Sequence, residues 1–264
     1  MPLALAYLEH PAVGAETAPP LLIAHGLFGS ARNFNAIGKR LADRRRVVLV
    51  DMRNHGSSPW ADEMGYPAMA GDLAAVIDRH CGGRAVVLGH SMGGKAAMAL
   101  ALTAPEKLAG LIVADIAPVA YSHSHRSFVA AMQGVDLARI TRRSQVDPLL
   151  AGTIPEAPLR AFILQNLVVD AEGARWRLNL AALDAEMACL IGFPEKLGGP
   201  FSGPALFLYG TASDYVTETS RPAIDALFPA ADFEGVDGAG HWLHAEQPEA
   251  FLAAVAAWLA NRVD

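Results

Sequence analysis

Residues 86–94, VVLGHSMGG, place Ser91 between two glycines directly after an apolar run. A serine hydroxyl is a weak nucleophile until a base removes its proton, and it must also project into a cleft. A sharp strand-to-helix turn exposes the hydroxyl, and glycines two positions before and after it remove side chains that would clash. The spacing of Gly89, Ser91 and Gly93 therefore predicts a nucleophile on such a turn. The alternative is a tight turn without chemistry.

The base for such a serine is expected late in the chain, after the last strand. The segment GAGHW places His241 between a predicted strand at residues 232–236 and a predicted helix at residues 248–260. Glycines before the histidine let its loop approach the serine. His244 is the competing histidine, and we favour His241 because it follows the glycines directly.

The acid that orients the histidine has two candidates. Asp115 ends the strand that follows the serine turn, and Asp214 follows the next strand in the segment GTASDYV. Such an acid holds the imidazole in the correct tautomer and stabilises the imidazolium. Both positions satisfy this pattern, and we lean towards Asp115. The other carboxylate is expected to support the site indirectly or to cap a helix.

An oxyanion that forms at an acyl group needs two backbone N–H donors. One is expected from Met92, directly after the serine, and the other from the loop that follows the first buried strand. The segment HGLFG occupies that loop, and we assign the second donor to Leu27. A glycine-rich turn with no further role is the alternative interpretation of this segment.

Short apolar runs position these residues. Each run ends at glycine or polar residues, and helix-like segments at 71–80 and 95–104 lie between them. Continuous apolar runs are typical of strands buried on both faces of a parallel sheet, so the alternation predicts a doubly wound α/β fold. Ligands of such sheets bind beyond the carboxyl ends of the strands, where the polar residues follow. The runs are residues 21–25, 47–51, 85–89, 111–115 and 205–209.

One region interrupts this alternation. Residues 118–204 show no clear buried strand and contain amphipathic or apolar segments separated by proline and glycine. We expect a helical cap at residues 118–203, inserted after the sixth strand and lying over the strand ends. Residues 1–117 and 204–264 would then form the core around a mostly parallel sheet flanked by helices.

Composition and charge narrow the class of protein. The chain of 264 residues is 52% hydrophobic and carries a net charge of −6, which is unlike the basic footprint of a nucleic-acid binder. No apolar run approaches the ~18 residues of a membrane span, and the first residues lack the pattern of a secretory signal. Two cysteines without a CxxC pair fit reduced thiols of a cytoplasmic protein. We expect a small-molecule substrate, with no nucleic-acid partner.

Several motifs together resemble the α/β-hydrolase superfamily, and more closely its small YbfF-like bacterial esterases, which are related to a mitochondrial abhydrolase-domain protein. The resemblance covers nearly the whole chain, including the cap segment at residues 175–180. It implies hydrolysis of carboxylic esters and of acyl-CoA thioesters, without a cofactor or metal, and it associates the acid with the strand end at Asp115. The aspartate in GTASDYV departs from close relatives. The motifs are HGLFGS, DMRNHGSS, YPAMAGDL, GHSMGGKAAMAL, ADIAPV, WRLNL and GAGHWLHAEQP.

A group of aromatic residues is expected to line an acyl pocket under the cap. Burial in the core is the usual role of each one, and only their grouping near the strand ends favours a pocket. We expect this role for Phe28, Phe162, Trp176, Phe193 and Trp242 beside Met92. Arg139, Arg142 and Arg143 form a basic cluster that is either a solvated helix face or an anion site for the phosphates of a CoA substrate.

Three further features are assigned structural roles. In DMRNHGSS, Asp51 and Arg53 are expected to bridge loops, while Gly56 permits a turn. Lys95, one helical turn after the serine, is interpreted as structural. The spacing of His123 and His125 suits metal ligation, but no further ligands group nearby, so a polar strip at the cap hinge is favoured.

The combined prediction is a serine hydrolase for carboxylic esters of short to medium acyl chains, acting through a Ser-His-Asp triad and an acyl-enzyme. Ser91 argues against haloalkane dehalogenases and epoxide hydrolases, which share the fold but use an aspartate at that position. Two alternatives stay open. One is a C–C bond hydrolase or lyase on the same scaffold, and the other is a ligand-binding module that does not turn its ligand over.

Overall fold

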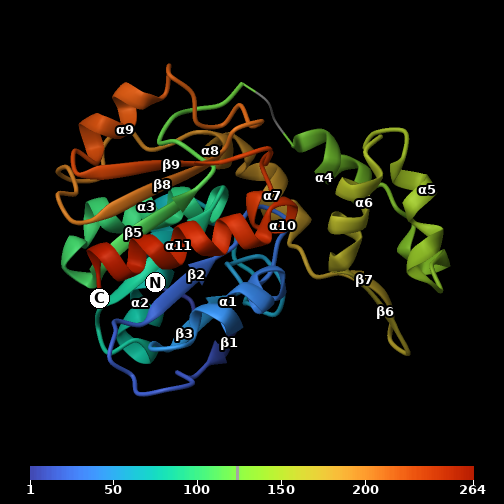
Figure 1. Ribbon diagram of the computed structural model, residues 1–264. Coiled ribbons are helices and arrows are strands. Elements are labelled where there is room, and N and C mark those ends of the chain that lie inside the picture. Colours follow the sequence, from blue (N-terminus) through green and yellow to red (C-terminus); the bar gives the residue numbers. More distant parts are fainter. Residues whose placement is uncertain (123–124) are drawn as a thin grey trace.

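The computed structural model of the chain describes residues 1–122 and 125–264. Within these residues a seven-stranded sheet runs in the order β1-β3-β2-β4-β5-β8-β9 (Figure 1). The edge strand β1 pairs antiparallel with β3, and every other pairing in this sheet is parallel. The predicted α/β class with a mostly parallel sheet is confirmed. The strands are β1 (Tyr7–His10), β2 (Leu21–Ala24), β3 (Val47–Val50), β4 (Ala85–His90), β5 (Leu108–Ala114), β8 (Ala205–Gly210) and β9 (Ala231–Val236).

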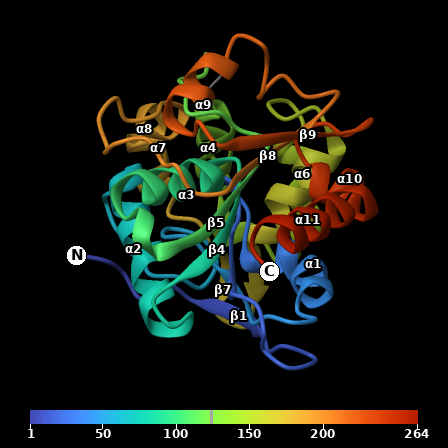
Figure 2. The ribbon, with the colours of Figure 1, turned by 60° about the vertical axis from the view of Figure 1, so that its left-hand side comes forward.

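Helices cover both faces of this sheet, which is why its strands are apolar without alternation. Successive strand residues point to opposite faces, so Leu22 packs in the core with α2 and α3, while Leu21 and Ile23 pack in the core with α1 and α11. Figure 2 shows the two helical layers on either side of the strands. The helices of this part are α1 (Asn35–Leu41), α2 (Tyr66–His80), α3 (Met92–Thr103), α9 (Arg221–Leu227), α10 (Leu243–Glu246) and α11 (Pro248–Arg262).

The segment between β5 and β8 is mostly helical, as expected, but it also contains an antiparallel hairpin. The hairpin is not the kind of buried strand that the sequence lacked here, because only two of its eight residues are buried and it includes polar side chains, so no buried apolar run marks it. In Figure 1 much of the segment forms a lobe beside the sheet, while α7 and α8 lie against the body. Its elements are α4 (Arg126–Gln133), α5 (Asp147–Leu150), α6 (Ala157–Ile163), β6 (Leu167–Asp170), β7 (Gly173–Trp176), α7 (Leu180–Ala185) and α8 (Met187–Ile191).

The position of this insertion needs one correction. It follows β5, the fifth strand within the described part of the chain, and not the sixth. Only β1 precedes the first buried strand, because the connection from His10 to Leu21 runs as bends and coil. Pro11, Pro19 and Pro20 lie in this connection, and proline cannot donate to a strand ladder.

Two other features of the described residues bear on earlier expectations. Cys81 is buried, Cys189 is exposed, and neither forms a disulfide. No helix in residues 1–122 or 125–264 combines the length and the apolar character that crossing a bilayer demands.

Candidate active site

Ser91 lies on the sharp turn between β4 and α3. Its φ of 52° and ψ of −118° fall outside the regions that non-glycine residues usually adopt. A Cβ at Gly89 would lie 2.2 Å from the carbonyl oxygen of Gly93, and a Cβ at Gly93 would lie 2.4 Å from the carbonyl oxygen of Ala24. Both positions therefore need glycine, and the close approach of strand and helix lifts Ser91 above the sheet.

His241 reaches Ser91 from the loop between β9 and α10. Its Nε2 lies 3.0 Å from the Ser91 Oγ, and its Nδ1 lies 2.8 Å from Oδ2 of Asp115. Two contacts fix this loop and ring: Nε2 of His90 donates to the His241 carbonyl at 2.8 Å, and the Tyr215 ring stacks on the imidazole with centroids 3.9 Å apart. Neither partner was singled out from the sequence.

Asp115 is fully buried at the end of β5, with a φ of 53°. Its Oδ1 accepts from the N–H of Gly210 at 3.0 Å, and its Oδ2 accepts from the Ser213 hydroxyl as well as from His241. These donors hold the carboxylate towards the imidazole. Hydrogen bonds to the charged form of a carboxylate stabilise that form.

The competing residues lie elsewhere. The Asp214 side chain is exposed, and it forms no hydrogen bond or ion pair with the residues that the structure describes. His244 is buried behind the site, where its ring stacks on Phe34 with centroids 4.2 Å apart. Burial lowers the pKa of His244 to about 3. The structure thus brings Asp115, and not Asp214, to the imidazole of His241.

The loop His25–Gly29 passes beside Ser91, and buried histidines hold it. His25 accepts from the N–H of Met52 at 2.9 Å and donates to the Gly26 carbonyl at 2.8 Å. Burial lowers the pKa of His25 to about 4, so its ring is neutral near pH 7. No hydrogen bond from the backbone N–H of Leu27 or Met92 is present in the described chain. These two donors are free for a ligand.

Phe28 in this loop is held from both sides of its backbone. Its φ is 62°, its N–H donates to Nε2 of His55 at 3.2 Å, and its carbonyl accepts from the Asn166 amide at 2.7 Å. His55 donates to the Arg53 carbonyl at 2.9 Å, and burial lowers the pKa of His55 to about 3. Asn166 belongs to the insertion, so core and insertion together position the loop. In the sequence, His55 was marked only by its place near a strand end. Asn166 was marked only by its place in the expected cap.

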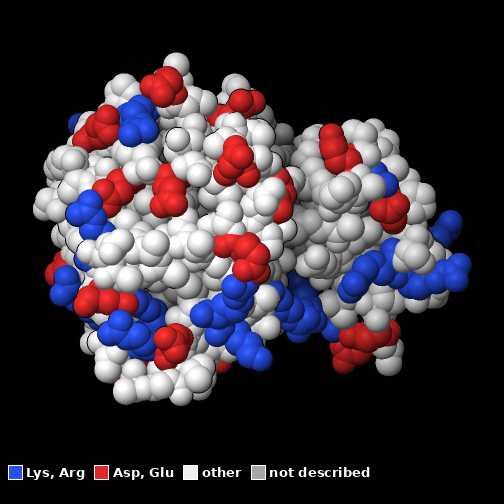
Figure 3. Space-filling view, in the orientation of Figure 1, with Lys and Arg blue, Asp and Glu red and all other residues white. Residues whose placement is uncertain are grey.

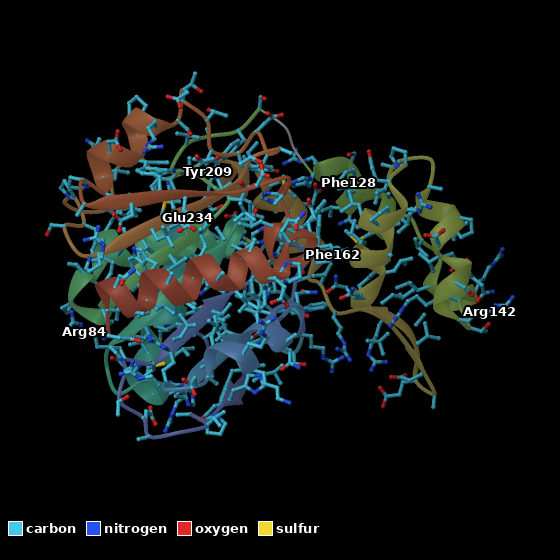
Figure 4. All side chains as sticks on the ribbon, viewed as in Figure 1. Arg84, Phe128, Arg142, Phe162, Tyr209 and Glu234 are labelled. Atoms are coloured by element: carbon cyan, nitrogen blue, oxygen red, sulfur yellow. The ribbon has the colours of Figure 1, made fainter. Side chains whose placement is uncertain are left out.

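A pocket of about 180 Å³ opens onto Ser91 and His241. Its apolar lining comes from the loop, from α4 and α6 of the insertion, and from the segment after His241. The apolar side chains from these segments are Leu27, Phe28, Phe128, Leu159, Phe162 and Trp242, and Phe34 adds to them. Figure 4 shows Phe128 and Phe162 on the side of the lobe that faces the body. Met92 lines a smaller adjoining pocket of about 40 Å³.

A model of the family described as alpha/beta hydrolase fold matches residues 19–248. The chain belongs to this family. The matched residues span most of the chain. They include β2 to β9 as well as Ser91 and His241.

This chain is similar to curated and solved members of the family over most of its length. The sn-1-specific diacylglycerol lipase ABHD11 of Xenopus tropicalis is 40% identical over 250 residues, which are 92% of this chain and 78% of that protein. Esterase YbfF of Escherichia coli K12 is 39% identical over 241 residues, 91% of this chain and 92% of that protein. A solved marine microorganism esterase superposes with a TM-score of 0.91 at 37% identity, covering 97% of this chain and all of that one. The expected resemblance and the hydrolase class are confirmed.

Two of the expected pocket residues do not line either pocket at the serine. Trp176 is buried within the insertion, where its indole N–H donates to the Met132 carbonyl at 3.1 Å. Phe193 packs beside Tyr66, with ring centroids 6.1 Å apart. Both assignments are corrected, because their positions near the strand ends in sequence do not bring their rings to the cavity.

The arginine cluster at residues 139–143 does not act as one site. Arg139 is exposed and pairs with Asp136 at 3.1 Å, and Figure 4 shows Arg142 at the outer end of the lobe. Arg143 turns the other way and donates to the Leu167 carbonyl at 2.9 Å. The solvated interpretation therefore holds for the first two arginines.

The remaining expectations concern loops and metals. Arg53 forms a bidentate pair with buried Asp72 at 2.7 and 2.9 Å, while Asp51 accepts from the N–H of Ala31 at 2.8 Å. This segment bridges loops, as expected. His123 lies outside the described residues, and among those described no group of three or more His, Cys, Asp or Glu side chains is arranged to hold a metal.

Proposed function

We propose that the chain is a serine esterase that hydrolyses carboxylic esters of short to medium acyl chains. The observation that carries this proposal is the pair of hydrogen bonds linking Ser91 Oγ, His241 and Asp115, at 3.0 and 2.8 Å, on the floor of an apolar pocket. The names of the curated relatives, an esterase and a diacylglycerol lipase, support an ester as the substrate.

Each step of the reaction has a residue in reach. His241 takes the proton of Ser91 as the hydroxyl attacks the ester carbonyl, and then gives that proton to the leaving alcohol. Asp115 keeps Nδ1 of the imidazole protonated and stabilises the imidazolium. The N–H groups of Leu27 and Met92 receive the oxyanion, and each such donor is worth about 3 kcal/mol of transition-state stabilisation. Water activated by His241 then releases the acid from the acyl-enzyme.

The pocket lining supports an apolar acyl group. Aromatic and aliphatic side chains surround the approach to Ser91, and three of them, Phe128, Leu159 and Phe162, come from the insertion. We propose that residues 118–203 act as a cap over a core of residues 1–117 and 204–264. In this arrangement the cap helices set the acyl length that the enzyme accepts.

The proposal is tested with p-nitrophenyl esters of increasing acyl length and one acyl-CoA, using wild-type protein and Ser91→Ala. Removal of a triad serine is expected to lower kcat by at least about 10⁴-fold. The exposed Ser202→Ala serves as the matched control and should keep wild-type rates. Ester hydrolysis that survives in Ser91→Ala at the wild-type rate would show that another group carries the reaction.

A further inference from the structure

A second, polar pocket of about 190 Å³ lies where the insertion meets the body. From the body it is lined by the turn after the loop His25–Gly29 and by the loop after β3. From the insertion it is lined by residues next to β6 and β7. The basic residues among its lining are Arg32, Arg143 and Arg177, and the acidic one is Asp51. Figure 3 shows basic side chains on both sides of the junction between body and lobe.

The charge of this pocket is unbalanced. Asp51 is the acidic side chain in the lining, and both its oxygens already accept backbone N–H groups, from Ala31 and from Ser57, each at 2.8 Å. Three arginines therefore line the pocket beside one carboxylate that is already hydrogen-bonded, and one of them, Arg143, also donates to the Leu167 carbonyl at 2.9 Å. The pocket carries a net positive charge.

Arg177 is the most informative of the three arginines. It is half-buried, and its guanidinium has no hydrogen bond or ion pair with any residue in the described ranges. Arg175, two residues earlier on the hairpin, is paired with Asp170 at 2.8 Å, and Arg160 of the insertion is paired with Asp147 at 3.0 Å. Arg32 in the body also lacks a carboxylate partner within those ranges. Arg32 and Arg143 are exposed, whereas Arg177 is a partly desolvated guanidinium without a partner in the described chain, which favours a bound anion.

This pocket shares a wall with the candidate active site. Asn33 lines the active-site pocket, and its amide donates at 3.2 Å to Gln165, which lines the polar pocket. Asn166 also lines the polar pocket, and its amide donates to the Phe28 carbonyl of the active-site loop at 2.7 Å. The two pockets are therefore neighbours, and a substrate whose ester lies at Ser91 would extend past Asn33 and Gln165 to reach the arginines.

We propose that Arg32, Arg143 and Arg177 bind a phosphate group carried by the substrate outside the acyl pocket. This proposal rests on the proposed esterase function and adds a substrate class to it. A guanidinium presents a planar fork that matches phosphate oxygens, whereas an acyl chain has no partner among these side chains. The phosphate belongs either to a nucleotide-bearing thiol in a thioester or to a glycerophosphate in a lipid ester, and the two sources share this chemistry.

Paired substrates separate these sources. An acyl-CoA is compared with the N-acetylcysteamine thioester of the same acyl group, and a 1-acylglycerol 3-phosphate is compared with the corresponding monoacylglycerol. In Arg177→Gln and Arg32→Gln, kcat/KM for the phosphate-bearing member of one pair is expected to fall about 10- to 100-fold, as for a lost charge-assisted hydrogen bond. The phosphate-free member should be unchanged. Arg142→Gln, an exposed arginine outside the pocket, is the matched control.

A binding measurement keeps the test independent of activity. Inorganic phosphate should raise the Tm of the wild-type protein above its value in chloride at equal ionic strength, and it should not do so in Arg177→Gln. An equal response of both proteins, or no response, would overturn the site. Phosphate binding combined with unchanged kcat/KM for both phosphate-bearing substrates would overturn its role in the substrate. If esters are hydrolysed but the arginine variants behave as wild type, this proposal fails while the esterase function stands.

Discussion

At the residue scale, three of the four non-glycine residues with a positive φ in the described chain lie at the candidate active site. Phe28, Ser91 and Asp115 have φ values of 62°, 52° and 53°, in a region that residues with a side chain rarely occupy. Such conformations cost about 1–3 kcal/mol each and persist only where the surroundings hold them. Each of these residues has specific backbone partners, such as Ala114 for the Ser91 N–H at 3.0 Å and Leu208 for the Asp115 N–H at 2.8 Å. These strained positions place Ser91 and Asp115 on either side of His241, and they place Phe28 in the lining of the adjacent pocket.

Separate substitutions of the two candidate acids test which one orients His241. Asp115→Asn should lower kcat for a p-nitrophenyl ester by about 10⁴-fold, because an amide cannot hold the imidazole in the tautomer that accepts the serine proton. Asp214→Asn should stay within about twofold of wild type, because its exposed side chain makes no hydrogen bond or ion pair within the described residues and surface changes are usually small. Both rates are measured on proteins whose circular dichroism matches wild type. A large loss in Asp214→Asn, with Asp115→Asn fully active, would reverse the assignment.

At the scale of elements, Lys95 ties the insertion to the helix that follows Ser91. Its side chain is buried in α3, and its Nζ donates to the carbonyls of Val119 at 2.8 Å, Ile191 at 2.9 Å and Gly192 at 2.6 Å. Val119 precedes the insertion's helices, Ile191 is the last residue of α8, and Gly192 follows that helix. Burial lowers the pKa of Lys95 to about 7, and the three carbonyl oxygens oppose this shift because they favour the ammonium. One side chain therefore fastens both ends of the insertion.

Removal of this side-chain ammonium should loosen both connections. In Lys95→Met the three carbonyls lose a buried donor, and the free energy of unfolding is expected to fall by about 3 kcal/mol or more. Urea unfolding measures this loss, and limited proteolysis should cut the connections flanking the insertion sooner than in wild type. Lys39→Met, an exposed lysine on α1, should change stability by no more than about 0.5 kcal/mol. An unfolding midpoint for Lys95→Met equal to that of Lys39→Met would contradict the role assigned to this lysine.

At the scale of the whole molecule, buried histidines beneath the site couple stability to pH. Burial lowers the pKa of His25 to about 4 and the pKa values of His55 and His244 to about 3, and it also lowers the pKa of His90. In the unfolded chain these groups titrate near the ordinary value of about 6.5. Between these values the unfolded state binds more protons than the folded state, so stability falls as the pH drops below about 6.5.

The expected acid sensitivity has a measurable slope. Each such histidine contributes about 1.4 kcal/mol of stability per pH unit between its two pKa values. His244→Phe keeps an aromatic ring against Phe34 and removes one titrating group, so its free energy of unfolding should depend less steeply on pH between about 6 and 4.5. Urea unfolding at several pH values gives both slopes. A wild-type free energy of unfolding that does not change across this pH range would show that the pKa values of these histidines are not lowered in the folded protein.

Local pattern in the sequence was sufficient to predict the parallel strands of the sheet and the turn that carries Ser91. The apolar runs end within one residue of the ends of β2, β3, β4, β5 and β8, because strands buried on both faces need uninterrupted apolar residues. Ser91 and His241 could be chosen because glycine spacing and order along the chain are local signals. The hairpin β6–β7 was not predicted, because most of its residues are only partly buried or exposed and form no such run.

Contacts between distant segments required the folded chain. Asp115 and Asp214 both follow strands, and only the arrangement of β5 beside β8 places the first against His241 and leaves the second exposed. The same holds for Trp176, which is buried in the insertion, and for Arg177, which meets Arg32 of the body at the polar pocket. The hydrophobic periodicity of the sequence indicates which face of an element is buried, but it does not indicate which other element packs against that face. That choice depends on packing across the whole chain.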